Sequence, residues 1–220
     1  MQNIVVNYDY TNNLYIANKW LKGLPELFAA DFEVASKWSK DYKSILQWRL
    51  NNFSNLSEEQ KRVWLQYIQS NGFSHPSLSV ITHLSVAWSN KDAYIIICDN
   101  NRIRHLIYNF LTTIPSTQIW HNAVFDFKHI FFHSGNLPKS YIDTQLLAKC
   151  LLNNANSARD RTGLKDLMAY AYGEWSISKE HYTLEEMWNE NTIRYSATDS
   201  CATFKLYEDI QEEINGKSKV

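Results

Sequence analysis

The sequence predicts an α/β fold built on a mixed sheet, for three reasons. Apolar runs short enough to be strands recur along the chain, and segments with helical spacing lie between them. Leu78–Ser89 and Ala93–Asp99 are neighbouring strand-like segments joined by the turn residues Asn90–Asp92, as in an antiparallel pair. After this pair, helices alternate with short strands, and this order places helices against the faces of a sheet.

Local signals predict the elements before this pair. Ile4–Tyr10 has the composition of a short strand. Tyr15–Leu21 is predicted to be a helix that ends at Gly23, with Pro25 just beyond. Leu27–Phe32 is an apolar run that suits a buried strand, so we expect it in the core of the sheet.

A helical hairpin, about residues 37–75, is predicted as an insertion before the antiparallel pair. Asp41–Phe53 has apolar residues at helical spacing, and Ser57–Gln60 is a capping-box signature for a second helix that stops near Gly72. Cationic and indole side chains would let the hairpin grip single-stranded nucleic acid or dock a polymerase. These side chains are Lys37, Lys40, Lys43, Arg49, Lys61 and Arg62, with Trp38, Trp48 and Trp64. A solvated pair of helices whose Trp residues pack on the core would have the same composition.

The elements after the antiparallel pair are predicted to be five helices and two short strands. The strands are Gln118–Trp120 and Ser140–Ile142. The helices are Asn101–Thr113, one ending near Ser134, Thr144–Leu152, Leu164–Tyr172, and a last one over Glu185–Ile210 with a break near Asn191. A polar loop, Asn153–Thr162, separates two of them.

Composition excludes several classes of protein. With 220 residues, 45% hydrophobic and 20% charged, the chain resembles one globular domain over residues 1–220 and not a disordered chain. We see no apolar run of membrane-spanning length and no signal peptide, so we expect no membrane association. Cys98, Cys150 and Cys201 lack the spacing of a disulfide framework or a zinc site. We therefore expect a cytoplasmic protein, or one of the host-cell cytoplasm if it is viral.

The charge balance limits how the protein would hold nucleic acid. Lys and Arg number 22 and Asp and Glu number 23, for a net charge of −1. Proteins that bind nucleic acid by neutralising phosphates alone are usually strongly basic. A nucleic-acid enzyme with this charge would hold its substrate locally, through metal ions or with the help of a partner.

Two carboxylates lie at the end of the predicted core strand. Asp31 and Glu33 are two residues apart, so strand alternation places both on one face and Phe32 on the other. Two anions on one face near a core repel each other and lose hydration, and Mg²⁺ or Mn²⁺ would offset both costs. The alternative is a solvated strand end without a ligand.

Further acids stand in predicted helices. Asp126 lies where a helix begins after a short strand, and Tyr195 and Asp199 are spaced i and i+4 on the last helix. Taken singly, Asp126 is explained by a favourable interaction with the helix dipole. An ordinary amphipathic helix would explain the Tyr195–Asp199 pair.

Together and in this order, these residues resemble the three motifs of the DEDD 3′–5′ exonuclease superfamily, tyrosine subtype. The motifs are Asp31-x-Glu33, Asn122-x-x-Phe125-Asp126 and Tyr195-x-x-x-Asp199. QIWHNAVFDFKHI, IDTQLLAKCLLNN, RTGLKDLMAYAYG and IRYSATDSCATFKLY are similar to the proofreading exonuclease domain of family-A DNA polymerases. The similarity runs from Ile4 to about Tyr207, except for the hairpin. It implies a ribonuclease-H-like fold, a mixed five-stranded sheet flanked by helices.

The resemblance also implies two divalent metal ions, Mg²⁺ or Mn²⁺, held by four acids. Asp31, Glu33 and Asp199 would ligate the tighter ion. Asp31 and Asp126 would hold the second, Asp126 largely through water. The ions would supply the activated water and the charge relief that phosphodiester hydrolysis needs. Tyr195 would orient the attacking water, because a neutral phenol is a poor base.

Other matched positions imply substrate contacts or structural roles. Asn122 and His121 stand where the family contacts the terminal nucleotides. Arg161 stands where the family can place a phosphate-binding cation, although a solvated loop charge explains it equally well. We interpret Asp143, at a family-typical position, as a cap of the next helix.

The resemblance predicts a metal-dependent 3′–5′ exonuclease acting on single-stranded DNA ends, in proofreading or DNA turnover. Since about twenty residues follow Asp199, we expect either a free-standing exonuclease, by analogy with phage replication systems, or one cut from a longer protein. A ribonuclease D-like exoribonuclease is an alternative, because it uses the same tyrosine-type motifs and sugar preference is open. A non-catalytic subunit that has this fold and binds a DNA polymerase is another.

Overall fold

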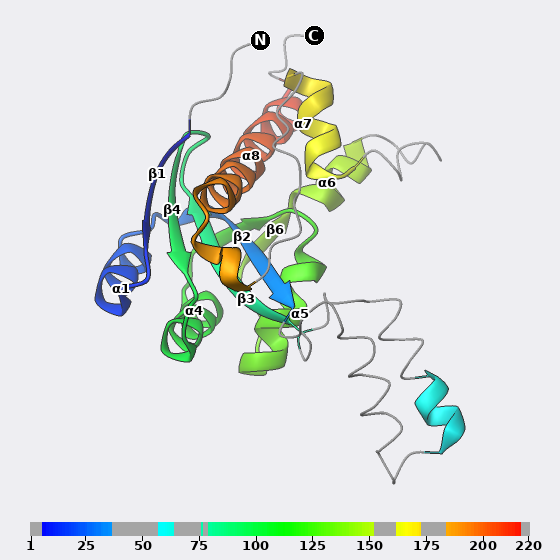
Figure 1. Ribbon diagram of the computed structural model, residues 1–220. Coiled ribbons are helices and arrows are strands. Elements are labelled where there is room, and N and C mark those ends of the chain that lie inside the picture. The colour runs from blue at the N-terminus through cyan, green and yellow to red at the C-terminus, as the bar shows by residue number, and fades with distance from the viewer. Residues whose placement is uncertain are drawn as a thin grey trace.

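A six-stranded mixed sheet with helices on both faces forms the centre of the computed structural model (Figure 1). The structure describes residues 6–36, 57–63, 76, 79–151, 162–172 and 184–216. The strands are β1 (Asn7–Thr11), β2 (Leu27–Ser36), β3 (Ser79–Ala87), β4 (Asp92–Ile97), β5 (Thr117–Trp120) and β6 (Tyr141–Asp143). Their order across the sheet is β1-β4-β3-β2-β5-β6.

The predicted antiparallel strands form the middle of this sheet. β3 pairs antiparallel with both β2 and β4, while β5 adds to β2 and β6 to β5 in parallel. The sheet has six strands and not the five implied by the resemblance, because β1 also pairs in parallel with β4. Every residue of β1 is in register with β4, so β1 covers what would otherwise be an open sheet edge.

The helices lie close to their predicted bounds. They are α1 (Leu14–Lys22), α4 (Asn101–Thr113), α5 (Ala123–Ser134), α6 (Thr144–Leu151), α7 (Leu164–Tyr172), the 3₁₀ helix η3 (Leu184–Trp188) and α8 (Glu190–Ile214). The break predicted near Asn191 lies at Asn189, whose side chain accepts from the Asn191 N–H and caps α8. The predicted end of α1 at Gly23 is confirmed.

Part of the predicted hairpin can be tested. Residues 58–63 are helical. The Ser57 N–H donates to Gln60 Oε1 at 2.9 Å, and the Gln60 N–H donates to Ser57 Oγ at 3.2 Å. These reciprocal bonds confirm the capping box. Residues 37–56 and 64–75, which carry Trp38, Trp48 and Trp64, lie outside the described residues. So does the predicted polar loop, Asn153–Thr162, except for its last residue.

The two faces of the sheet are covered by different helices. α1, α4 and α5 pack on one face over large side chains such as Phe28, Leu84 and Trp120. α8 crosses the other face over side chains such as Ala29, Ala87 and Ile95 (Figure 1). α6 and α7 in turn pack against α8. The second face, under α8, is the one that carries the predicted acids of β2.

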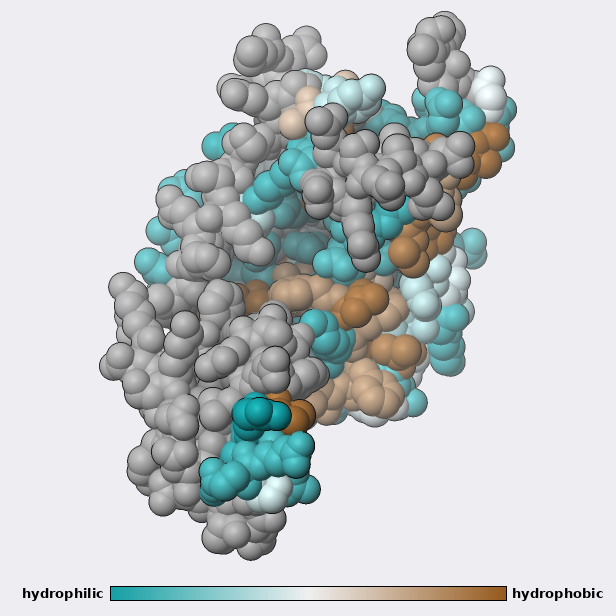
Figure 2. Space-filling view, turned by 90° about the vertical axis from the view of Figure 1, so that its right-hand side faces the viewer, coloured by the Kyte–Doolittle hydropathy of each residue, from teal (hydrophilic) through white to brown (hydrophobic). Residues whose placement is uncertain are grey.

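An exposed apolar surface lies over α5, β6 and α6 (Figure 2). Its exposed side chains are Val124, Phe131, Phe132, Tyr141 and Leu146. β6 is an outer strand of the sheet, so this surface borders a strand edge. Among the helices that the structure describes, none has both the length and the apolar character needed to cross a bilayer.

Candidate active site

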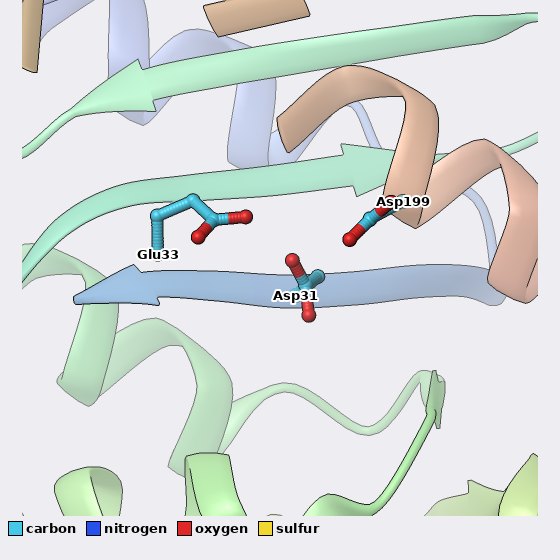
Figure 3. A group of neighbouring side chains, drawn as sticks. All are labelled: Asp31, Glu33 and Asp199. Carbon is cyan, nitrogen blue, oxygen red and sulfur yellow. The ribbon is translucent and has the colours of Figure 1, made fainter. Parts of the chain in front are cut away.

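Asp31, Glu33 and Asp199 come together on the α8 face of the sheet (Figure 3). One carboxylate oxygen of each lies within 4.8 Å of the corresponding oxygens of the other two. Asp31 and Glu33 project from β2, and Asp199 faces them from α8. Phe32, between the two acids of β2, is buried in the core of the opposite face. The predicted alternation is therefore confirmed.

These three carboxylates fit a divalent cation. They offer only oxygen ligands, which hard ions such as Mg²⁺ and Mn²⁺ prefer. All three are partly buried, so their mutual repulsion is poorly screened and a cation would relieve it. In the part of the chain that the structure describes, no other group of three potential metal-binding side chains has this spacing.

Asp126 reaches β2 because β5 is short. The register between β2 and β5 ends at the pair Ala29–Ile119, and the chain then turns into α5. Beyond that pair, the Phe32 N–H donates to Asp126 Oδ1 at 3.2 Å. A carboxylate on the first turn of α5 thus takes the backbone group that a longer β5 would have paired.

Burial and charge both act on Asp126, which is 2% exposed. Burial raises the pKa of its carboxyl group well above the usual value, and the nearby Asp31 charge raises it further. The bond from the Phe32 N–H opposes this rise. Asp126 therefore stands outside the group of three carboxylates but within electrostatic range of Asp31. A cation between Asp31 and Asp126 would favour the ionised form of both.

Asp143 fixes the position at which α5 begins. Its carboxylate accepts from the N–H groups of Asn122 at 3.1 Å and Ala123 at 3.0 Å. It also accepts from the Gln145 N–H at 2.9 Å, at the start of α6. The predicted cap of the next helix is confirmed, and the same side chain also caps α5. The side chain of Asn122 makes no cap bond there, and its backbone is left-handed with φ 60°.

Tyr195 lies one helical turn before Asp199 and is 3% exposed. Its hydroxyl group is hydrogen-bonded to the Asp199 side chain. Burial raises the pKa of the phenol, and the charges of Asp199 and Glu33 raise it further. The hydroxyl is therefore neutral and acts as a hydrogen-bond donor toward the acids.

Lys165, on the first turn of α7, was not among the predicted site residues. Its Nζ donates to the Tyr195 Oη at 2.6 Å and lies 4.2 Å from the centroid of the Tyr195 ring. Its one sequence signal is its place in the segment RTGLKDLMAYAYG, which resembles the family. A lysine in an amphipathic helix gives no indication of a contact with another helix 30 residues away.

The three predicted substrate-binding residues have different surroundings. Asn122 is exposed at the start of α5, near Asp126. His121 uses both ring nitrogens within the protein, Nδ1 with Thr144 Oγ1 at 2.9 Å and Nε2 with the Thr162 carbonyl at 3.0 Å. Burial lowers the pKa of His121 to about 4, so the ring is neutral. We interpret it as structural and not as a nucleotide contact. Arg161 lies outside the described residues.

A comparison with protein families identifies the chain. A family model described as 3′–5′ exonuclease matches residues 76–215, well over half of the chain. The chain therefore belongs to the 3′–5′ exonuclease family. The matched range includes Asp126, Tyr195 and Asp199 but not the two acids of β2. A search of curated proteins finds no match.

Solved structures of exonucleases share the fold. Brucella melitensis NrnC bound to pGG has a TM-score of 0.59 and 16% identity, covering 97% of this chain and 84% of that one. NrnC with bound Mg²⁺ has a TM-score of 0.57 and 15% identity, covering 99% and 85%. Escherichia coli RNase D, an exoribonuclease involved in structured RNA processing, has a TM-score of 0.63 and 14% identity, covering 96% and 46%. These similarities confirm the ribonuclease-H-like fold, and one of the three structures holds Mg²⁺.

Proposed function

We propose that this member of the 3′–5′ exonuclease family hydrolyses terminal phosphodiester bonds at single-stranded 3′ ends, with DNA as the first substrate to test. The observation that carries the proposal is the convergence of Asp31, Glu33 and Asp199 from two elements that are distant in sequence. Such a group is costly in a fold unless a cation joins it. Asp126 and Tyr195 lie beside the group, where a substrate phosphate would be held.

Two divalent ions are proposed, in the arrangement that the motifs imply. Asp31, Glu33 and Asp199 would hold one, and Asp31 and Asp126 the other. When bound, such ions lower the pKa of a water and offset charge on the attacking and leaving oxygens. The bond from the Phe32 N–H to Asp126 holds that carboxylate at the edge of β2 and limits the positions it can take.

Tyr195 is proposed to orient the attacking water. Its phenol stays protonated, because burial and the neighbouring carboxylates raise its pKa. A protonated phenol cannot take a proton from water, but it can donate one hydrogen bond and so fix the direction of attack. Asn122, exposed at the start of α5, is proposed to contact the terminal nucleotide.

RNA is the second candidate substrate. The solved structures that share the fold include an RNase D described as an exoribonuclease and NrnC bound to pGG. Their low sequence identity leaves substrate choice in this chain to experiment. A role in proofreading, a polymerase partner and a cytoplasmic location stay predictions of the sequence.

The test compares DNA and RNA strands of one sequence, labelled at the 3′ or the 5′ end, in Mn²⁺ or in EDTA. We expect metal-dependent shortening from the 3′ end by the wild type and by Asp9→Asn, which removes an exposed carboxylate of β1. Asp126→Ala should abolish it. The relative rates on the two strands identify the preferred sugar. Failure of the folded wild type to cleave either strand would contradict the proposal and favour the non-catalytic subunit.

A further inference from the structure

We infer that Lys165 is a positioning residue that sets the orientation of the Tyr195 hydroxyl group. The inference rests on the proposed function, because it gives Tyr195 the role of orienting the attacking water. It adds a residue from α7 to a site otherwise built from β2, α5 and α8. Lys165 lies in the segment RTGLKDLMAYAYG but in none of the three motifs that carry the acids and Tyr195.

The hydrogen bond between the two side chains has one possible direction. A protonated lysine has three N–H donors and no acceptor, so the Tyr195 Oη must accept at 2.6 Å. The phenolic hydrogen then points away from Lys165. The phenol is also hydrogen-bonded to the Asp199 side chain, which can only accept. Lys165 thus directs the phenolic hydrogen toward the acids, where the attacking water would lie.

The ammonium group also restrains the phenol ring itself. Lys165 Nζ lies 4.2 Å from the ring centroid, within the range of a cation–π contact. The ring is buried, so water screens this contact weakly. Without Lys165, the phenol oxygen would lose this charged donor, and the hydroxyl hydrogen would be less restricted in direction.

The start of α7 is anchored so that Lys165 faces α8. The Thr162 carbonyl accepts from His121 Nε2 at 3.0 Å and from Gln145 Nε2 at 3.3 Å. One turn beyond Lys165, Met168 is fully buried in the cluster that joins α7 to α8. His121, which is half-buried, therefore has a consequence for the site, because it ties the chain just before α7 to the end of β5.

The experiment is a double-mutant cycle on the full chain with Lys165→Met, Tyr195→Phe and both together. We expect Lys165→Met to lower kcat by about tenfold or more, with KM changed less than about twofold, because positioning affects the reacting geometry. In the Tyr195→Phe background, Lys165→Met should lower kcat by less than about twofold. Lys165→Arg, which keeps a charged donor, should recover part of the loss. Lys19→Met, an exposed lysine of α1, is the matched control and should match the wild type.

Two measurements without turnover accompany the cycle. Calorimetric titration with Mn²⁺ should give dissociation constants within about threefold for the wild type and Lys165→Met, since the lysine is not a ligand. Urea unfolding should show that every variant is folded. Three results would overturn the inference. Lys165→Met could lower kcat as much in the Tyr195→Phe background as in the wild type, it could raise KM without changing kcat, or it could weaken Mn²⁺ binding tenfold. If the wild type is active and Lys165→Met is equally active, the inference about Lys165 is wrong but the proposed function stands. If the folded wild type is inactive, both the proposed function and the inference are wrong.

Discussion

The two faces of β2 differ in the side chains they carry and in what those side chains do. On the face under α1, α4 and α5, Phe28, Ala30 and Phe32 are at most 3% exposed and pack into one apolar core. On the face under α8, the same alternation presents Ala29, then Asp31, then Glu33. One strand thus holds the fold together with its even positions and presents the acids with its odd positions.

The difference between the faces extends to the helices above them. Three helices cover the apolar face, whereas α8 crosses the other face and packs on it through a mixture of small side chains, such as Ala29 and Ala197, and large ones, such as Ile95 and Phe204. α8 also carries Asp199, which it brings within reach of the acids of β2. We therefore expect substitutions on the two faces to separate stability from activity.

Asp31→Asn should have the largest effect, and it should fall on activity alone. Asp31 is the acid proposed to touch both metal ions, so we expect cleavage to fall by at least about 10³-fold. Stability in EDTA should stay level or rise, since one of three neighbouring anions is lost. Single-turnover cleavage and urea unfolding measure the two effects, with Asp9→Asn as the control. A large loss of stability would mean that the acid face also supports the fold.

Phe28→Ala should show the opposite profile. Phe28 is fully buried under the helices of the apolar face, so its loss should cost about 3–5 kcal/mol of unfolding free energy. Cleavage per folded molecule should stay within about threefold of the wild type at low temperature, because independent sites act additively. Urea unfolding followed by tryptophan fluorescence measures the loss. Inactive but folded protein would show that the two faces are coupled.

Lowering the pH should weaken the fold through His83, which is buried, and His121, which is half-buried. Burial lowers the pKa of both His83 and His121 to about 4. In the unfolded chain they titrate near pH 6.5. Between these values the unfolded state binds more protons, so stability is full above about pH 6.5 and falls toward pH 4, by up to about 3 kcal/mol per histidine.

The urea midpoint in EDTA between pH 7.5 and 4.5 tests this expectation. His121→Gln should flatten the dependence, while His105→Gln, on the exposed side of α4, should leave it unchanged. His83 hydrogen-bonds the Met187 carbonyl of η3 at 2.7 Å, so part of the loss falls on the α8 face. A midpoint independent of pH would contradict the assignment of both rings as neutral.

Asp143→Asn should have the smallest effect, and it should lower both stability and activity. It removes the charge shared by the first turns of α5 and α6, for a loss of about 1–2 kcal/mol. Because α5 carries Asp126, we also expect a decrease in kcat of about a few-fold. Chemical denaturation and steady-state cleavage measure the two losses. If stability falls and kcat does not, α5 is held in place by its other contacts.

The parts of this site that could be predicted from the sequence are those set by the spacing of residues along a single strand or helix. Alternation placed Asp31 and Glu33 on one face of β2, and the motif order indicated that Asp199 joins them. Lys165 and the second role of Asp143 were missed because each depends on how two helices meet. His121 was assigned to substrate because its two partners, Thr144 and Thr162, are not visible as neighbours in the sequence.

The short β5 leaves a natural reporter in the site. The register between β2 and β5 ends before Phe32, and Asp126 accepts the Phe32 N–H there. Amide hydrogen exchange at Phe32 therefore measures how long that carboxylate stays against the strand. Faster exchange would show Asp126 swinging away, and slower exchange on adding Mn²⁺ would show it fixed. The position of the acid proposed to hold a metal ion can thus be followed in solution without any substrate.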